Sequence, residues 1–286
     1  MSQLVHPLEK FVRPGMASRI WCSGCSDGIV LNEFLRAIDE LGLDTSKMVV
    51  VSGIGCAGRA SGYMNVDAFH ATHGRAIPVA VGIKVARPDL NVVVISGDGD
   101  LFSIGGNHFL HAARRNVGVK VICINNFNYG MTGGQAGPTT PLGAHLTTTP
   151  YGNIENPINL VQLAAAVGAV YVARWTAFHI RRIKESIKKS LAKKGFTFVE
   201  VVGICPEQYG RRQKMPKPID MMMWFKKNSV ISKELDPSKA EFTPERIVVG
   251  EFVDAEKPEY TELMREQVNS IIGRLEKEGR LTNAEI

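Results

Sequence analysis

The sequence predicts an α/β protein whose mostly parallel sheet carries helices on both faces. Short runs rich in β-branched residues, typical of strands, alternate along the chain with segments that have the apolar period of a helix. Such alternation is typical of parallel sheets covered on both sides, in which ligands bind beyond the carboxyl ends of the strands. The strands are expected at residues 48–52, 91–96, 119–125, 170–174 and 196–202.

Each predicted helix begins at residues that can cap an N-terminus and ends at a glycine. The third has an apolar stripe formed by Ile180, Ile183, Ile187 and Leu191. The three helices are expected to run from Ser26 or Asp27 to Gly42, from Asn156-Pro157 to Gly168, and from Thr176 to Gly195.

Length and composition fit a globular protein with a substantial core. The chain has 286 residues, of which 44% are apolar and 22% charged, enough for one large or two smaller domains. After Gly210 the pattern changes to an irregular stretch rich in basic residues and methionine, followed by a polar helical segment around 260–279. We therefore expect a domain over residues 1–210 and a C-terminal extension over 211–286 that wraps a partner subunit or covers the site.

Charge and hydropathy exclude several classes of protein. No apolar run reaches the ~20 residues that cross a bilayer, and the N-terminus lacks the charged-then-apolar pattern of an export signal. We therefore expect a cytoplasmic protein without a membrane partner. The net charge of +6 is modest, as for a solvated, slightly basic surface or one that attracts anionic substrates or an acidic protein. We expect no nucleic-acid partner.

Four of the five cysteines are spaced as metal ligands. Cys22-x2-Cys25 is followed by Cys56, next to a glycine-rich turn, and by Cys205. Without an export signal, such thiols are expected to be reduced or metal-bound rather than paired in disulfides. A Cys-x-x-Cys pair with two distant thiols can hold one tetrahedral metal or one cubane iron–sulfur cluster. Cys123 lies within an apolar strand, where we expect it to pack as a small side chain.

Polar residues follow two of the predicted strands at their carboxyl ends. Gly97-Asp98-Gly99-Asp100 comes directly after the strand 91–96, and Asn126 and Asn128 follow the strand 119–125. The Asp98 carboxylate, the Asn126 amide oxygen and the Asn128 carbonyl are hard donors that suit Mg²⁺, whose other positions hold water and phosphate oxygens. The two glycines let the backbone approach a diphosphate, and the following helix offers its N-terminus to the same anion. The alternative is a Gly-Asp-Gly turn with a purely structural role.

These motifs together resemble a known family. Gly97-Asp98-Gly99 through Asn125-Asn126 is similar to the diphosphate-binding half of thiamine-diphosphate enzymes. With Trp21-Cys22-Ser23-Gly24-Cys25, Gly55-Cys56 and Cys205-Pro206, the chain resembles the β subunit of 2-oxoacid:ferredoxin oxidoreductases over residues 18–212. The stretches 72–75 and 126–135 look most like the 2-oxoglutarate branch. The resemblance implies the diphosphate-type thiamine-diphosphate-binding fold.

The resemblance implies a role for each matching residue. Cys22, Cys25, Cys56 and Cys205 would ligate one 4Fe–4S cluster, and Asp98, Asn126 and the carbonyl of Asn128 would hold Mg²⁺. The long aperiodic segment 127–156 would form the wall over cofactor and substrate. The residues around thiamine diphosphate would be Ile54, Gly55, Cys56, Ala57, His73, Gly99, Asp100, Gly130 and Met131.

The resemblance also implies an activity and partners. Its members oxidatively decarboxylate a 2-oxoacid with coenzyme A and pass the electrons through the cluster to ferredoxin; the 2-oxoglutarate branch reversibly forms succinyl-CoA and CO2. The glutamate that activates the thiamine ring belongs to a second domain that nothing in this sequence resembles. We therefore expect an α subunit to supply that glutamate, in a dimer of heterodimers, and no catalytic residue is assigned to this chain.

Arg59 and two histidines are further candidates beside these motifs. Arg59, three residues after Cys56, is expected to pair with the far carboxylate of 2-oxoglutarate, because a guanidinium binds carboxylates through two hydrogen bonds. The alternative is a surface arginine or a salt bridge to the partner chain. His73 is favoured over a merely packed histidine as a hydrogen-bond donor to the cofactor, and the same question applies to His70.

Two alternative functions stay open from the sequence. One is a pyruvate or branched-chain 2-oxoacid oxidoreductase of the same family, which a substrate panel would separate. The other is a binding module in which the four cysteines hold structural zinc and the Gly-Asp-Gly turn is incidental.

Overall fold

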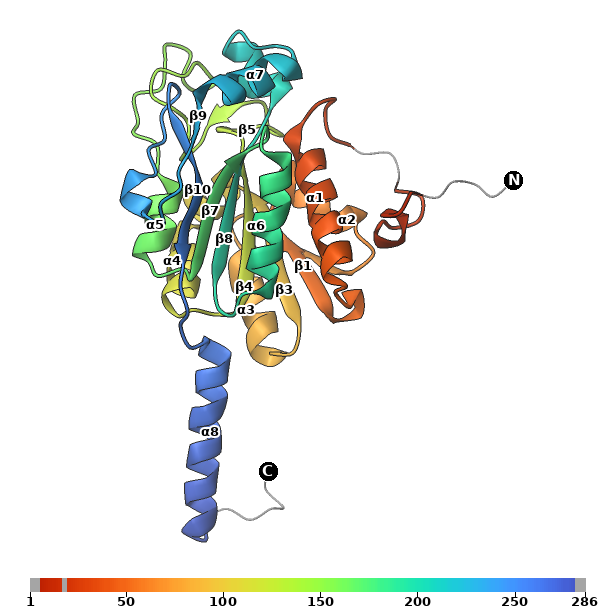
Figure 1. The fold of residues 1–286 in the computed structure, drawn as a ribbon, viewed down its shortest axis with the longest axis vertical. Helices are drawn as coiled ribbons and strands as arrows, with labels where there is room; N and C mark the ends of the chain where they lie inside the picture. The colour runs from red at the N-terminus through yellow and green to blue at the C-terminus, as the bar shows by residue number, and fades with distance from the viewer. Residues whose placement is uncertain (1–5, 17–19, 281–286) are drawn as a thin grey trace, which may run out of the picture.

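The computed structural model describes residues 6–16 and 20–280 and is built on an eight-stranded sheet (Figure 1). Its strands are β1 (Met48–Ser52), β2 (Asp67–His70), β3 (Asn91–Gly97), β4 (Val119–Asn125), β7 (Tyr171–Thr176), β8 (Thr197–Val202), β9 (Ser229–Ile231) and β10 (Ile247–Asp254). The strand order is β2-β1-β3-β4-β8-β7-β10-β9. The strands from β2 to β7 are mutually parallel, whereas β10 is antiparallel to β7 and parallel to β9.

Helices cover both faces of this sheet because its strands are apolar on both sides. In β4, Ile122 and Ile124 face one core, and Val121 and Cys123 face the other. The first core is closed by α1 (Ser26–Leu41), α2 (Ala60–Tyr63), α6 (Ile180–Ala192) and α7 (Pro218–Asn228). The second is closed by α3 (Ala76–Ala86), α4 (Gly106–Arg114) and α5 (Leu160–Ala166). The predicted fold class is confirmed, and Cys123 is a fully buried core residue.

The five predicted strands are all present, but the helix starts differ from the prediction. Ser26 is itself the first residue of α1. The side chain of Asn159, rather than Asn156, caps α5 by accepting from the backbone N–H of Gln162. Thr176 ends β7 instead of opening a helix. Of these three helices only α5 has a side-chain cap; Cys25 before α1 and His179 before α6 make no capping side-chain hydrogen bond.

The segment after residue 210 is more regular than expected. It contributes α7 and the strands β9 and β10, so the prediction of an irregular stretch is wrong for residues 218–231 and 247–254. The two strands extend the same sheet. The predicted polar helix is present as α8 (Tyr260–Lys277), which runs away from the body of the molecule (Figure 1). It begins beside the amino end of β4, where Glu259 accepts from Gly118 N. Partner wrapping by this segment stays a prediction.

In residues 6–16 and 20–280, no helix combines the length and apolar character of a bilayer-crossing segment. Residues 1–5, on which the prediction about export rests in part, lie outside the described residues, as do residues 17–19 and 281–286.

A buried ion pair ties the centre of the sheet together. Arg174 on β7 and Glu200 on β8 are fully buried, with Nε and Oε2 2.7 Å apart. The second carboxylate oxygen of Glu200 accepts from Asn125 Nδ2 on β4 at 2.8 Å. The guanidinium also donates to Asn159 Oδ1 and lies 4.4 Å over the Phe242 ring. The pair therefore links three strands to α5 and to the segment before β10.

Removing the positive partner of this pair should destabilise the fold strongly. Arg174→Met leaves Glu200 buried without its counter-ion, which costs about 3–5 kcal/mol of unfolding free energy. Arg246→Met is the matched control, because its pair with Glu241 is half-exposed and contributes little. Denaturant titration of both variants measures the difference, and equal stabilities would contradict the assignment.

Candidate active site

The carboxyl ends of β1, β3 and β4 meet at one edge of the sheet and enclose a cavity of about 190 Å³. Every residue predicted around thiamine diphosphate or magnesium lines this cavity. Tyr129 and Thr132 line it too, and neither was predicted. Except for His73, which follows β2, the lining residues lie at or just after the ends of the three adjacent strands β1, β3 and β4. The parallel register therefore brings into one cavity residues that are up to about 80 positions apart in the sequence.

Asp98 is a buried carboxylate at the base of the cavity. Its side chain is 1% exposed, and Oδ2 accepts from Thr139 Oγ1 at 2.5 Å. Oδ1 has a long contact of 3.4 Å from Asn126 N, and the backbone amides of Asp98 and Gly99 also act on the carboxylate. Burial raises the pKa of Asp98 to about 6, and within the described residues no Lys, Arg or His forms an ion pair with it. A buried carboxylate without a counter-ion is costly, so this position suits a cation.

The neighbouring donors fit the same cation. The Asn126 amide oxygen accepts from Asn128 N at 3.4 Å, and the Asn128 side chain donates to Asn126 O at 2.7 Å. The turn is thereby folded on itself beside Asp98. The Asn126 amide oxygen and the Asn128 carbonyl oxygen are hard metal ligands, the type that Mg²⁺ prefers.

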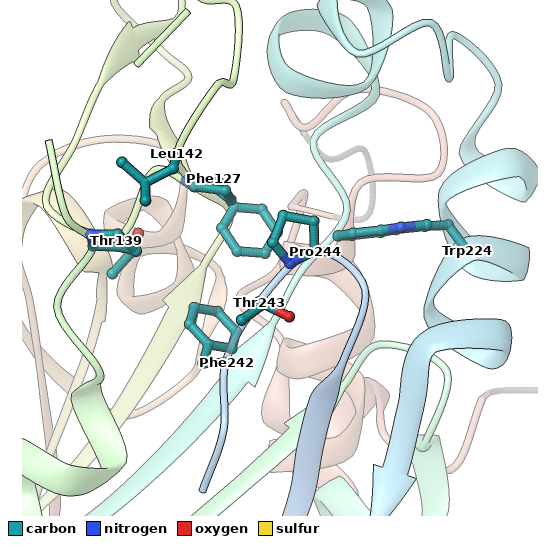
Figure 2. Close-up of a pocket in the computed structure, with 9 residues that line it drawn as sticks. Phe127, Thr139, Leu142, Trp224, Phe242, Thr243 and Pro244 are labelled. Atoms are coloured by element: carbon teal, nitrogen blue, oxygen red, sulfur yellow. The ribbon is translucent and has the colours of Figure 1, made fainter. Parts of the chain in front are cut away.

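Phe127, between the two asparagines, has the left-handed backbone angle φ of 66°. Such a conformation is strained for a bulky residue and persists only when the surroundings hold it. The Phe127 ring packs 4.9 Å from Tyr209 and 5.7 Å from Phe242 between ring centroids. Figure 2 shows the ring beside Phe242 and Trp224, around an apolar cavity of about 80 Å³. Burial of this ring holds the strained turn, and with it both asparagine donors.

Asp100, two residues after Asp98, lines the cavity, and its carboxylate is bound by the protein itself. Its Oδ1 accepts from His73 Nδ1 at 2.5 Å and from the backbone of Gly74 at 2.8 Å and Ile54 at 3.2 Å. Its Oδ2 accepts from Ser96 Oγ at 2.8 Å. The 2% exposed carboxylate is fully occupied by the protein and ties together the walls of the cavity. A carboxylate would also repel a diphosphate, so we interpret Asp100 as a positioning residue.

The four predicted cluster ligands gather beside this cavity. Cys22 is exposed, Cys25 and Cys56 are half-buried, and Cys205 is buried; all are free thiols. Burial raises the pKa of Cys25, Cys205 and Cys56, the last to about 12, and the thiolate charges of Cys205 and Cys22 add to the effect on Cys56. The charge of Asp27 also raises the pKa of Cys25, Cys56 and Cys205, so these three thiols share one acidic neighbour.

No three His, Cys, Asp or Glu side chains within the described part of the chain converge as ligands of a single metal ion. In a cubane cluster each thiolate binds a different iron, so its ligands need not meet at one point.

The thiols and the oxygen donors are direct neighbours. Cys56 lines the cavity that contains Asp98. The Cys205 sulfur lies 4.0 Å from Asn128 Oδ1. A Cβ placed on Gly130 would lie 3.4 Å from the same sulfur. The two predicted sites therefore share one edge of the sheet, with only a turn of backbone between them.

The predicted substrate residue Arg59 and the weaker histidine candidate, His70, also lie outside the cavity. Arg59 ends the short turn Ala57–Arg59 with an exposed side chain and is not among the lining residues. His70 is exposed, and its Nδ1 lies 3.1 Å from Gly58 O. The role of Arg59 toward a substrate carboxylate stays a prediction, and His73 is the histidine that reaches the cavity.

Besides Thr132, the sequence did not reveal three residues in or beside the site. Thr139 binds Asp98 from 41 positions away, within a loop that has no periodic pattern. Tyr129 lies over Gly99, where any Cβ would collide with its ring. Asp27 is 1% exposed, accepts from Cys25 Sγ at 3.4 Å and leaves Oδ1 without a partner in the structure. Its position two residues after Cys25 is the one signal in the sequence. The predicted cap at Asp27 is wrong, because Asp27 lies within the first turn of α1.

Gly53 is required by the close approach of Asp100. A Cβ at this position would collide with Asp100 Oδ2 and Ser96 Oγ. Gly53→Ala is therefore expected to lower the free energy of unfolding by about 1–3 kcal/mol through overpacking. Gly62→Ala is the control, because Gly62 is exposed on α2 with open space around it, and alanine is favoured in helices. The denaturant midpoints of both variants measure the difference. A Gly53→Ala protein as stable as the wild type would contradict the close contact between Gly53 and Asp100.

Comparison with known proteins agrees with this arrangement. Residues 48–201 match the family model "Thiamine pyrophosphate enzyme, C-terminal TPP binding domain". The chain is 52% identical over 275 residues to the 2-oxoglutarate synthase subunit KorB of Methanocaldococcus jannaschii, covering 96% of this chain and 100% of the relative. It is 38% identical over 284 residues to a 2-oxoacid:ferredoxin oxidoreductase subunit beta from Sulfolobus sp, with 92% of each chain covered.

A solved structure is similar over almost the whole chain. It is the 2-oxoglutarate:ferredoxin oxidoreductase from Magnetococcus marinus with 2-oxoglutarate, coenzyme A and succinyl-CoA bound. The TM-score is 0.83 at 31% identity, covering 99% of this chain and 94% of the other. Sequence and structure thus agree: the chain belongs to the β subunits of 2-oxoacid:ferredoxin oxidoreductases, in the branch of the 2-oxoglutarate synthase KorB subunits.

Proposed function

We propose that this chain is the β subunit of a 2-oxoglutarate:ferredoxin oxidoreductase. The reaction joins 2-oxoglutarate and coenzyme A to give succinyl-CoA and CO2, and two electrons leave one at a time through a 4Fe–4S cluster to ferredoxin. The observation that carries the proposal is the shared edge of the sheet, where Cys56 and Cys205 border the cavity that contains Asp98. The similarity to KorB subunits supports 2-oxoglutarate as the substrate.

The residues at this edge fit magnesium and a diphosphate. Asp98, Asn126 and the carbonyl of Asn128 would hold Mg²⁺, which would offset the charge of the buried carboxylate. Gly99 leaves the backbone free of a side chain where the phosphates would approach. Thiamine diphosphate, when bound, supplies the electron sink for decarboxylation. His73, oriented by its hydrogen bond to Asp100, presents its other ring nitrogen for a hydrogen bond in the cavity.

The four thiols fit an iron–sulfur cluster. Cys22, Cys25, Cys56 and Cys205 would ligate it, each after losing its proton, because a metal displaces protons even from thiols whose pKa is raised. Asp27 beside them adds a buried carboxylate whose charge, like other charges near a cluster, affects the reduction potential.

A second subunit completes the site. No glutamate is among the residues that line the cavity, and the family model matched is a C-terminal thiamine-binding domain alone. We therefore place the glutamate that activates the thiamine ring on an α subunit, within a dimer of heterodimers. The cavity is open in this chain, which leaves one side for that subunit.

The test is turnover by the α and β subunits expressed together under anaerobic conditions, with methyl viologen as electron acceptor. We expect coenzyme A-dependent dye reduction with 2-oxoglutarate, and little with pyruvate or branched-chain 2-oxoacids. A preference for pyruvate would move the chain to another branch of the family. Colourless, zinc-loaded protein without activity would support the non-catalytic binding module instead.

Three variants separate the two metal sites in this assay. Asp98→Ala should abolish turnover but keep the broad cluster absorption near 400 nm, because the thiols are untouched. Cys56→Ala should lose both the absorption and the activity. Cys123→Ala is the control, since this thiol is buried in the second core, and it should keep both. Normal turnover by Asp98→Ala would show that the magnesium assignment is wrong.

A further inference from the structure

A basic surface lies directly beside the most exposed of the four thiols. The turn that contains Cys22 and Cys25 packs closely against the start of α7. The contact is so close that a Cβ at Gly24 would collide with the Pro218 ring. The chain between Cys205 and Pro218 forms the rim of this region, with Gly210 N donating to Cys205 O at 2.8 Å. Figure 1 shows α7 beyond the carboxyl ends of the strands, at the same end as the start of α1.

Side chains on this rim are exposed and positively charged. We define the α7 surface as Cys22, Arg211, Arg212, Lys214, Lys217, Ile219, Met223, Lys226 and Lys227, all of them exposed.

Most of these charges are without an acidic partner. Arg211 pairs with Glu207, but within the described residues no Asp or Glu pairs with Arg212, Lys214 or Lys217. The lysines of α6 behave differently. Lys184 and Lys188, for example, both pair with Glu40. The positive charges of the α7 surface are thus less compensated than those of the α6 lysines.

Two apolar residues complete the surface. Ile219 is 59% exposed and Met223 51% exposed, and they are four positions apart, so they lie on one face of α7. Lys226 and Lys227 follow them at the next turn of the helix. Apolar side chains surrounded by a charged rim are the usual anatomy of a transient protein interface.

We propose that the α7 surface docks the electron acceptor, a small acidic protein whose redox group faces Cys22. This inference rests on the proposed function. Of the four thiols, Cys22 is the exposed one, so the edge of a cluster at Cys22 is nearest to solvent. One electron passes from the reduced cluster to the oxidised carrier, and no bond forms or breaks. Complementary charge would steer the carrier to this edge and make the encounter dependent on salt.

The experiment uses the α–β complex with the double substitution Arg212→Glu and Lys217→Glu. An acidic 2[4Fe–4S] ferredoxin and methyl viologen are compared as acceptors. We expect the KM for ferredoxin to rise about tenfold or more, and its dependence on salt to weaken, because two positive charges become negative. Turnover at saturating viologen should not change, since a small dye does not need the docking surface.

Arg114→Glu with Arg115→Glu is the matched control. These two exposed arginines lie at the end of α4, just before the amino end of β4 and at the opposite edge of the sheet. The control should leave the KM for ferredoxin unchanged. A second variant, Met223→Asp, should raise the KM for ferredoxin through the apolar part of the surface while viologen turnover is kept.

The outcomes distinguish the two proposals. If the double variant reduces viologen normally and its KM for ferredoxin is that of the wild type, the docking surface is wrong and the proposed function stands. If the double variant no longer copurifies with the α subunit, the surface belongs to the subunit interface and the inference is overturned. If the wild-type complex reduces no viologen with any 2-oxoacid, the proposed function fails and the inference with it.

Discussion

The parallel alignment of β1, β3, β4 and β8 is the constraint on which the site depends. These four strands are neighbours in the order β1-β3-β4-β8 and end at the same edge of the sheet. Each is followed by chemically active residues, Cys56 after β1, Asp98 after β3, Asn126 after β4 and Cys205 after β8. No long-range recognition between these residues is needed. The register that buries the apolar faces of the sheet also places sulfur and oxygen donors side by side.

Two buried carboxylates in the same turn serve opposite purposes. Asp100 is surrounded by hydrogen-bond donors from His73, Ser96 and two backbone amides, so its charge is compensated by the protein. Asp98 has one strong donor, Thr139, and a raised pKa. Asp100 therefore holds neighbouring segments together, whereas the Asp98 carboxylate can bind a cation. Phe127 stabilises the turn between Asn126 and Asn128, because its buried ring holds the strained backbone in place.

The sequence was sufficient for the fold class and for most of the residues that line the cavity, because both depend on local patterns. Strands such as β4 are recognised by their β-branched residues, and Asp98 by the glycines around it. The sequence was insufficient where distant segments decide. Thr139 and Tyr129 reach the site through the fold of a loop without periodicity. The role of Asp100 depends on donors at His73, Gly74 and Ile54, which lie 26 to 46 positions away in the sequence. The edge strand β9 has only three residues, most of them exposed, which gives a weak pattern. The strand β10 lies between β7 and β9 and begins with the buried apolar run Ile247–Val249, so this strand was recognisable from the sequence.

The central claim is that the cluster and the magnesium site share one cleft, and magnetic resonance tests it most directly. In the α–β complex, Mn²⁺ replaces Mg²⁺ and the cluster is reduced with dithionite. Nearby paramagnetic centres accelerate each other's spin relaxation. We therefore expect bound Mn²⁺ to broaden the electron paramagnetic resonance signal of the reduced cluster in the wild type. The broadening should vanish in Asp98→Ala, which cannot hold the ion. An unaltered cluster signal in wild-type protein with Mn²⁺ shown to be bound would contradict the account.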